Sequence, residues 1–358
     1  MGDGGGTEAG PAPGGSGAGP GSRAGSGESA WTAFRGSPYF AACVLVLLIA
    51  AAAGLFAGSY TYAMANPTPR HIPTAVTGVP TSQVKRARFV AGMQEALGAS
   101  LELHHYDTFD QARDAVEEQR VFAILREPGP GQPFPRLYVS SASGASVAQL
   151  LTESAPRVGA ANGVPITVTD INPLQHGDPR GLAIFYVSLA AVILGFVGAI
   201  QLMVNAGTLT PIARVAFTAG YAMLGAFAIA SIVDWGLGAL RLPFAESWAI
   251  LAATLFTTGM VFTMFNTLIG RWALLPTWGL MVLLGNPSSG GAVSWPLLPS
   301  LLGRIGRWLP PGASVNAQHT AVYFGGHQHA FPFLVLAAWA LTATAVFLLR
   351  TRPHTKTT

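Results

Sequence analysis

The sequence predicts a polytopic α-helical membrane protein of six spans, with an extracytoplasmic α/β domain between the first and second spans. Half of the 358 residues are hydrophobic and 10% are charged. Uncharged apolar runs of about 20 residues recur, and each is long enough to cross roughly 30 Å of hydrocarbon as a helix. The segment between the first two runs is different, because it holds eleven of the 16 acidic residues. That segment is therefore expected to fold outside the membrane.

The chain is expected to begin with a disordered cytoplasmic tail, residues 1–37, followed by the first transmembrane helix, residues 38–62. The tail consists mainly of Gly, Pro, Ala and Ser, which bury too little apolar surface to offset the entropy of ordering. A cleaved signal peptide is the alternative, since "AMA" (63–65) resembles a cleavage site. The apolar run is longer than the usual core of about 7 to 15 residues, which favours an uncleaved anchor.

The extracytoplasmic α/β domain is expected over residues 63–181. Its strands are predicted at 72–77, 101–105, 121–125, 136–140 and 165–169, and its helices at 82–97, 108–118 and 145–159. The second helix has the clearest start, because Thr108 and Gln111 match a capping box. The alternation of strands and helices predicts a small, mostly parallel sheet.

A membrane domain with five spans is expected over residues 182–350. Four spans are clear, at 182–204, 212–233, 247–269 and 331–349. Arg214 and Arg271 flank the two tightest connections, and the tail 351–358 adds Arg352 and Lys356. Basic residues in short loops mark the cytoplasmic side, so both termini are expected to be cytoplasmic. Arg241, Arg304 and Arg307 lie on the opposite side and oppose this orientation without reversing it.

With the tail inside, the 13-residue apolar run 272–284 has to rise outward as a further span, which makes six. It would rise only about 20 Å, so it needs a thinned bilayer or help from flanking residues. A broken outer element, 285–312, follows and begins with "GNPSSGG" (285–291). Unpaired backbone at membrane depth is tolerated only where protein or water covers it. We therefore expect this stretch to line an outward vestibule; a helix terminator without substrate contact is the alternative.

Seven residues are candidates for a transport path: Asn286, Ser288, Ser289, Gly290, Gly291, Asp234 and Glu246. Asp234 and Glu246 flank Arg241 across a short outer loop, and ionisable groups at a membrane edge can mark an ion path. The alternative for this pair is an interfacial ion pair with Arg241.

Catalysis, metal binding and a cofactor are not expected. The single cysteine, Cys43, lies inside the first span, and no sequence cue places a base beside Ser288 or Ser289. The loop that carries His319, His327 and His329 lacks a rigid ligand set. A phosphate-cradling loop is excluded, because neither of the two lysines follows a glycine-rich turn. Nor is a nucleic-acid partner expected.

Several segments together resemble a known family. They are "IPTAVT" after the first span, "TFDQARDAVEEQRVFAIL", "VTDINPLQHGDPRGLAIFY" before the second span, "LGNPSSGG" and "LLPSLLGRIGRWLPPGASVNAQHTAVYF". Their order resembles the permease subunits of type-2 ABC exporters, and more closely the YhgE/phage-infection-protein class. The resemblance covers about residues 40–350. It implies a permease fold and a separate ABC ATPase subunit as partner.

One departure argues against that ATPase. The connection between the second and third spans is only "NAGTLTPIAR" and carries no carboxylate, whereas ATP-driven members of the family have an extended acidic segment there. The expected function is a permease-like subunit of the plasma membrane, a homodimer in contact with membrane lipid, that exports an amphipathic or lipid-like compound. The alternative is a non-transporting scaffold or receptor whose ectodomain binds a partner.

Overall fold

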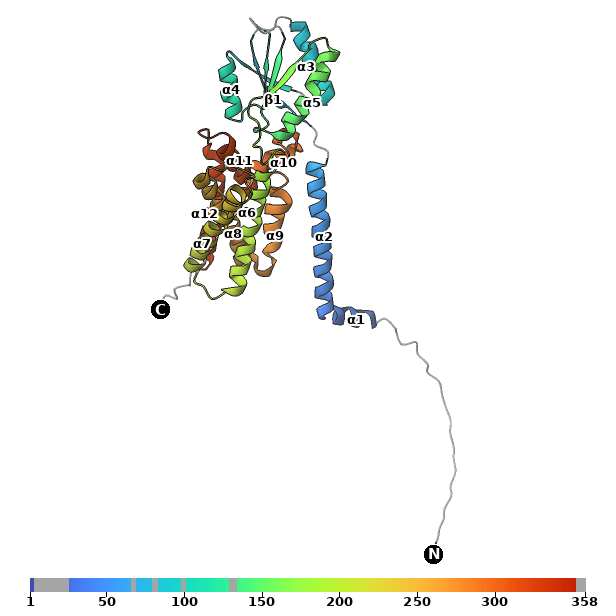
Figure 1. Ribbon diagram of the computed structural model, residues 1–358. Helices are drawn as coiled ribbons and strands as arrows, with labels where there is room; N and C mark the ends of the chain where they lie inside the picture. Colours follow the sequence, from blue (N-terminus) through green and yellow to red (C-terminus); the bar gives the residue numbers. More distant parts are fainter. Residues whose placement is uncertain (3–25, 66–68, 79–82, 98–100, 129–133, 352–358) are drawn as a thin grey trace, which may run out of the picture. The chain divides into compact units, whose positions relative to one another are not determined.

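The computed structural model of the protein describes residues 1–2, 26–65, 69–78, 83–97, 101–128 and 134–351. Most of the two predicted tails, with Arg352 and Lys356, lies outside the described residues. The described part is mostly helical and contains one five-stranded sheet (Figure 1). The chain divides into two compact units, residues 1–54 and residues 55–358.

The first unit contains helix α1 (Ser26–Arg35) and the first part of α2 (Pro38–Met64). The presence of α1 corrects the prediction that residues 1–37 are disordered throughout. Trp31 and Phe34 lie on this helix with their ring centroids 5.9 Å apart, and both rings meet Phe40 edge-on. The composition of the whole tail, dominated by Gly, Ala and Ser, concealed this short aromatic segment.

The sheet of the second unit has the strand order β2-β1-β3-β4-β5. The strands are β1 (Ile72–Thr77), β2 (Leu101–Tyr106), β3 (Ala123–Arg126), β4 (Arg136–Val139) and β5 (Thr167–Asp170). All neighbours are parallel except β3 and β4, which are antiparallel. Every residue of β1, which lies between β2 and β3, is buried, as expected for a strand covered on both faces. The predicted mostly parallel α/β sheet is confirmed.

Helices cover both faces of the sheet (Figure 1). On one face, α3 (Gln83–Leu97) and α5 (Ala145–Ala161) pack over Ile72 and Val76; on the other, α4 (Phe109–Glu117) packs over Ala75. Successive β1 side chains thus alternate between two cores. The predicted cap of α4 forms, because the Thr108 side chain accepts from the Gln111 N–H at 3.2 Å.

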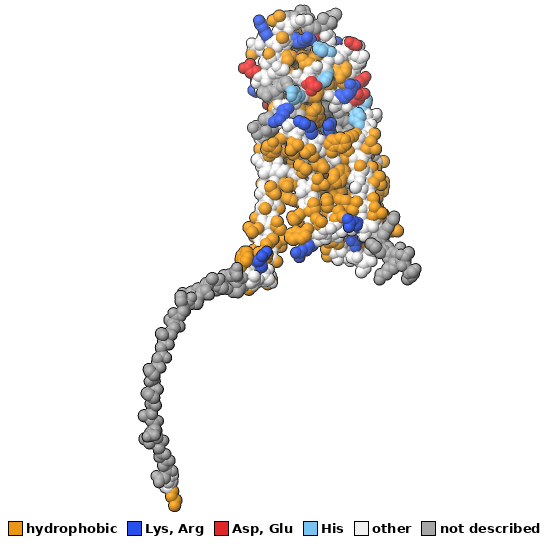
Figure 2. Space-filling model, turned by 180° about the vertical axis from the view of Figure 1, so that it is seen from behind, with side chains coloured by type: hydrophobic (Ala, Val, Ile, Leu, Met, Phe, Trp, Pro, Cys, Tyr) orange, Lys and Arg blue, Asp and Glu red, His pale blue; other side chains and the backbone are white. Residues whose placement is uncertain are grey.

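Five helices among the described residues are long and apolar enough to cross a membrane. They are α2, α6 (Ala183–Asn205), α7 (Pro211–Ser231) with the π-helical η1 (Ile232–Gly236), α8 (Phe244–Ile269) with η2 (Gly270–Trp272), and α12 (Ala330–Arg350). A wide band of hydrophobic side chains covers this helical part, with basic side chains at its lower edge (Figure 2). These helices indicate a membrane-embedded protein.

Helix α8 is the centre of the bundle, and α6, α7, α11 and α12 pack against it. At its junction with α6 and α7, small residues let the backbones approach closely. The Tyr221 hydroxyl donates to the Gly195 carbonyl oxygen, and a Cβ on Gly195 would collide with Thr258 Oγ1. Membrane helices typically associate through such small residues.

The segment predicted as the remaining span is short. It consists of α9 (Leu274–Trp278) and the π-helical η3 (Gly279–Gly285), an apolar helix of 12 residues. A turn follows, and then η4 (Trp295–Leu297), α10 (Ser300–Ile305), η5 (Gly306–Trp308) and α11 (Pro310–Tyr323). The sixth span therefore stays a prediction, whereas an interruption after residue 285 is present in the structure.

Candidate functional site

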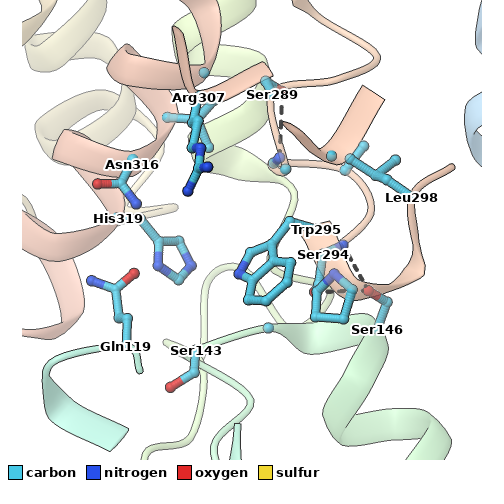
Figure 3. Close-up of a pocket in the computed structure, with 18 of the residues that line it drawn as sticks. Gln119, Ser143, Ser146, Ser289, Ser294, Trp295, Leu298, Arg307, Asn316 and His319 are labelled. Atoms are coloured by element: carbon cyan, nitrogen blue, oxygen red, sulfur yellow. Dashed lines mark hydrogen bonds between the residues drawn. The ribbon is translucent and has the colours of Figure 1, made fainter. Parts of the chain in front are cut away.

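A cavity of about 990 Å³ opens where the sheet domain meets the short elements between η3 and α12 (Figure 3). The sheet domain contributes Gln119, Phe122 and the start of α5. The broken outer element contributes residues 288–292, and α11 contributes Asn316 and His319. Ligand sites in proteins commonly have volumes of about 300 to 1,000 Å³ and form at such junctions. This cavity is the main candidate site.

Four of the seven predicted path residues line the cavity: Ser288, Ser289, Gly290 and Gly291. The two hydroxyls are used locally. Ser288 Oγ donates to the Leu284 carbonyl oxygen, and Ser289 Oγ donates to the Asn286 carbonyl oxygen, each at 2.7 Å. Their protons therefore fix the turn, and only oxygen lone pairs remain for a ligand.

The two glycines have different backbone roles. Gly290 has a φ of +83°, a conformation that other residues rarely adopt. Gly291 has an ordinary φ, but an added Cβ would lie 3.1 Å from Phe185 Cβ and 3.2 Å from Val315 Cγ1. The turn is thus held close to α6 and α11, and side chains at either position would disturb it.

Asn286 does not reach the cavity. It is buried at 2% exposure and lies beside Tyr60, although its amide nitrogen has no hydrogen-bond partner of good geometry among the described residues. Asp234 and Glu246 are also outside the lining. The Glu246 carboxylate accepts from Gln328 Nε2 at 2.8 Å. The structure therefore does not bring these three residues together with the other four.

The expected ion pair of Arg241 is not formed, since no salt bridge joins it to Asp234 or Glu246 in the described part of the chain. Its backbone instead pairs with Gln175. The Arg241 N–H donates to Gln175 Oε1 at 2.7 Å, and Gln175 Nε2 donates to the Arg241 carbonyl oxygen at 3.2 Å. Arg241 thus fixes the loop before α8 to the segment before α6.

The sheet domain is tied to the rest of the unit at two further places. At the start of α5, the Ser294 N–H donates to Ser146 Oγ at 3.0 Å. After α4, Gln119 Nε2 donates to Thr320 Oγ1 at 2.6 Å, and the imidazole of His327 lies 3.8 Å from the Glu117 carboxylate. The cavity lies between these two attachments (Figure 3).

The three histidines of the predicted loop separate in the structure. His319 lines the cavity, His327 approaches Glu117, and the His329 ring contacts the Glu118 carbonyl oxygen at 3.2 Å. Burial lowers the pKa of His319, so its imidazole is neutral at physiological pH. No group of three metal-ligating side chains occurs among the residues that the structure describes.

Sequence reasoning missed the basic lining of the cavity. Arg70, Arg180, Arg304 and Arg307 all face it, and Arg307 extends into it toward His319 (Figure 3). In the sequence, Arg304 and Arg307 bear only on the orientation of the spans. Their spacing of three residues, which places both on one helical face, was a usable signal. Arg70 and Arg180 gave none, because they precede different elements far apart in the chain.

Comparisons of the chain with family models, with curated proteins and with solved structures find no match. The described residues define a class of protein: a membrane-embedded protein with five span-length helices among those residues, a mostly parallel α/β domain, and a large cavity where the domain meets the helices.

Proposed function

We propose that the protein is a permease-like subunit of the plasma membrane that exports an amphipathic or lipid-like compound. The observation that carries this proposal is the cavity of about 990 Å³, because it combines polar groups with the apolar side chains of Trp295, Leu298 and Phe331. A compound with one polar and one apolar end would meet complementary surface there. The predicted order of elements, which resembles type-2 ABC exporters of the YhgE/phage-infection-protein class, supports the same reading.

The proposed topology has six spans, with α9 and η3 as the short one, and both termini in the cytoplasm. The sheet domain would then be extracytoplasmic and the cavity would face outward. A homodimer is part of the proposal, and an ATPase partner is not, because the connection 205–214 is short and lacks a carboxylate.

Cysteine labelling tests this topology. In a Cys43→Ala background, Thr152→Cys places a thiol on an exposed position of α5, and Thr208→Cys places one in the α6–α7 connection. A membrane-impermeant maleimide added to intact cells should label residue 152 and leave residue 208 unlabelled until the cells are opened. The opposite pattern would overturn the proposed orientation.

A transport assay tests the function. Cells that express the protein should accumulate less of a toxic amphiphile or lipophilic dye than cells that lack it. The matched comparison is Gly291→Val against Gly279→Val at equal membrane levels. Position 291 is crowded by Phe185 and Val315, whereas an added Cβ at position 279 meets open space. Unchanged accumulation of every compound tested would refute export.

One observation favours the alternative, a non-transporting receptor or scaffold. The buried threonines of α8 return their protons to their own helix: Thr254 donates to the Ile250 carbonyl oxygen and Thr263 to that of Gly259. These hydroxyls have no proton left for a compound passing through the bundle. In a receptor, the cavity would bind its ligand without exporting it. Measuring binding and cellular accumulation separately therefore distinguishes a receptor from an exporter.

A further inference from the structure

All the side chains that bring a formal charge at neutral pH to the cavity are arginines: Arg70, Arg180, Arg304 and Arg307, and no Asp or Glu is part of the described lining. Two nearby carboxylates lie outside the lining and accept hydrogen bonds from backbone N–H groups. Asp178 accepts from the N–H groups of Leu182 and Ala183 at 3.0 and 2.9 Å. Asp170 accepts from Ser141 at 3.2 Å. The cavity is therefore strongly electropositive.

The guanidinium groups of these arginines are available to a ligand. Within the described residues, none of the four forms a salt bridge, whereas Arg86, Arg113 and Arg120 each have a glutamate partner. Nor does the side chain of any of the four form a hydrogen bond with another residue that the structure describes. Arg304, near the end of α10, and Arg307, in η5, are three residues apart, and like charges at that spacing repel each other. An anion bound between the two guanidinium groups would offset this repulsion.

The start of α5 adds to the positive potential. Ser143, Gly144, Ala145 and Ser146 line the cavity, and no side chain caps this 17-residue helix. A helix N-terminus carries a partial positive charge and unpaired N–H groups. Gly144 allows the close packing here, because a Cβ at that position would lie 2.6 Å from Ser294 Oγ.

The same cavity has an exposed aromatic border. Trp295 is 49% exposed and Trp308 is 57% exposed. The Trp308 ring packs edge-on against Phe331 at 4.9 Å, and all three residues belong to the lining. Tryptophan is typical of the interface between lipid headgroups and hydrocarbon. A free inorganic anion would make no favourable contact with this aromatic surface, whereas an acyl chain would cover it.

We propose that the cavity binds the phosphate-type headgroup of an amphiphile, with the headgroup oxygens held by Arg304, Arg307, Arg70 and Arg180 and the acyl chains against Trp295 and Trp308. Guanidinium groups bind phosphate oxygens in pairs and stay charged at all physiological pH values. This inference rests on the proposed function, for which it names the substrate class.

The test is direct binding, measured on the purified full-length protein in a neutral detergent. The probe is short-chain phosphatidic acid, followed by the fluorescence of the tryptophans. We expect Arg304→Gln/Arg307→Gln to weaken binding at least about tenfold, because charge-assisted hydrogen bonds are lost. Arg304→Lys/Arg307→Lys should lie in between, since lysine keeps the charge without the paired geometry. Arg271→Gln, at the opposite end of α8, should bind as wild type does.

Two further ligands distinguish the sources of the anion. Diacylglycerol with the same chains lacks the phosphate, and inorganic phosphate lacks the chains; both should bind at least about tenfold more weakly than phosphatidic acid. If diacylglycerol binds as tightly as phosphatidic acid, the arginines do not hold a headgroup. If inorganic phosphate binds as tightly, the acyl chains are not part of the recognised ligand. Arg70→Gln/Arg180→Gln, from other chain segments, tests the same site if the first variant fails to fold.

Binding and export can fail separately. Wild-type affinity in the Arg304→Gln/Arg307→Gln variant would overturn this inference and leave export open. Tight, arginine-dependent binding by the purified protein, together with unchanged accumulation in cells that express it, would support the headgroup site and reject export.

Discussion

The Ser294 N–H donates to Ser146 Oγ at 3.0 Å, and the two hydroxyl oxygens are 2.9 Å apart. This pair joins the broken outer element to the first turn of α5, at the edge of the cavity (Figure 3). Ser294 is 7% exposed, so its N–H is largely shielded from the water that could replace Ser146 as acceptor. The contact therefore couples the position of the turn to that of the sheet domain.

Ser146→Ala should destabilise this junction. The substitution leaves a buried N–H without an acceptor, which costs about 1–3 kcal/mol. We expect a lower melting temperature of the full-length protein in detergent and faster hydrogen exchange at residues 289–294. Ser300→Ala is the matched control, since Ser300 also lines the cavity but is exposed. Equal exchange in the two variants would show that the pair has no structural role.

Gly290→Ala should strain the turn without filling space. At φ +83° an L side chain is disfavoured by roughly 1 kcal/mol or more, although an added Cβ meets nothing within 4 Å. Gly291→Ala should act through crowding against Phe185 and Val315. A Val315→Ala background, which removes the Cγ1 that an added Cβ would meet, should therefore partly relieve the second variant and leave the first unchanged in thermal unfolding. Relief of both variants, or of neither, would contradict the assignment of separate roles.

Glu127 should make the sheet domain more stable as the pH falls. Burial raises the pKa of its carboxyl group, and Arg86, 3.7 Å away, opposes that shift only in part. The folded state thus binds a proton at higher pH than the unfolded state. Stability should rise as the pH falls through the raised pKa, and the gain is complete below the ordinary value of 4.5.

Glu127→Gln tests that sign. The variant should melt at a higher temperature than wild type at neutral pH, and the difference should shrink as the pH is lowered toward 4.5, measured by thermal unfolding in detergent across that range. Glu153→Gln, an exposed carboxylate on α5, serves as control. A destabilised Glu127→Gln variant at neutral pH would mean that attraction to Arg86 outweighs the cost of burial.

The sheet domain should fold alone, but with reduced stability. Its larger core includes Leu297 from the broken outer element, which is 3% exposed. Residues 69–181 expressed alone lack this side chain and the contact of Trp295 with Phe122. We expect a cooperative melt at reduced temperature, and Leu297→Ala in the full chain to cost about 2–5 kcal/mol. A non-cooperative melt of the isolated domain would contradict an independent fold.

Local signals predicted most of this fold. The Thr108 cap and the strand at 72–77 depend on neighbouring residues alone, and both are present in the structure. The interruption after Gly285 followed from Gly and Pro in an apolar run. The helix α1 was missed because two aromatic residues, Trp31 and Phe34, were averaged into a Gly-rich tail.

The candidate site was predictable only in part, because side chains from distant segments form it. "GNPSSGG" marked one wall through its own composition. Arg70 and Arg180 join that wall only after the sheet has folded, so no local pattern linked them. Asn286 shows the converse: it stands within the marked stretch, yet helix geometry turns it into the protein interior beside Tyr60. Composition located the segment, and tertiary packing decided which of its side chains face the cavity.

The close junction of α6, α7 and α8 limits how the protein can change shape. With Gly195 against Thr258 and the Tyr221 hydroxyl on the Gly195 carbonyl, these three helices have no room to slide past one another. A conformational cycle would have to keep them as a rigid body. Any movement of the cavity wall would therefore have to take place in elements outside this junction.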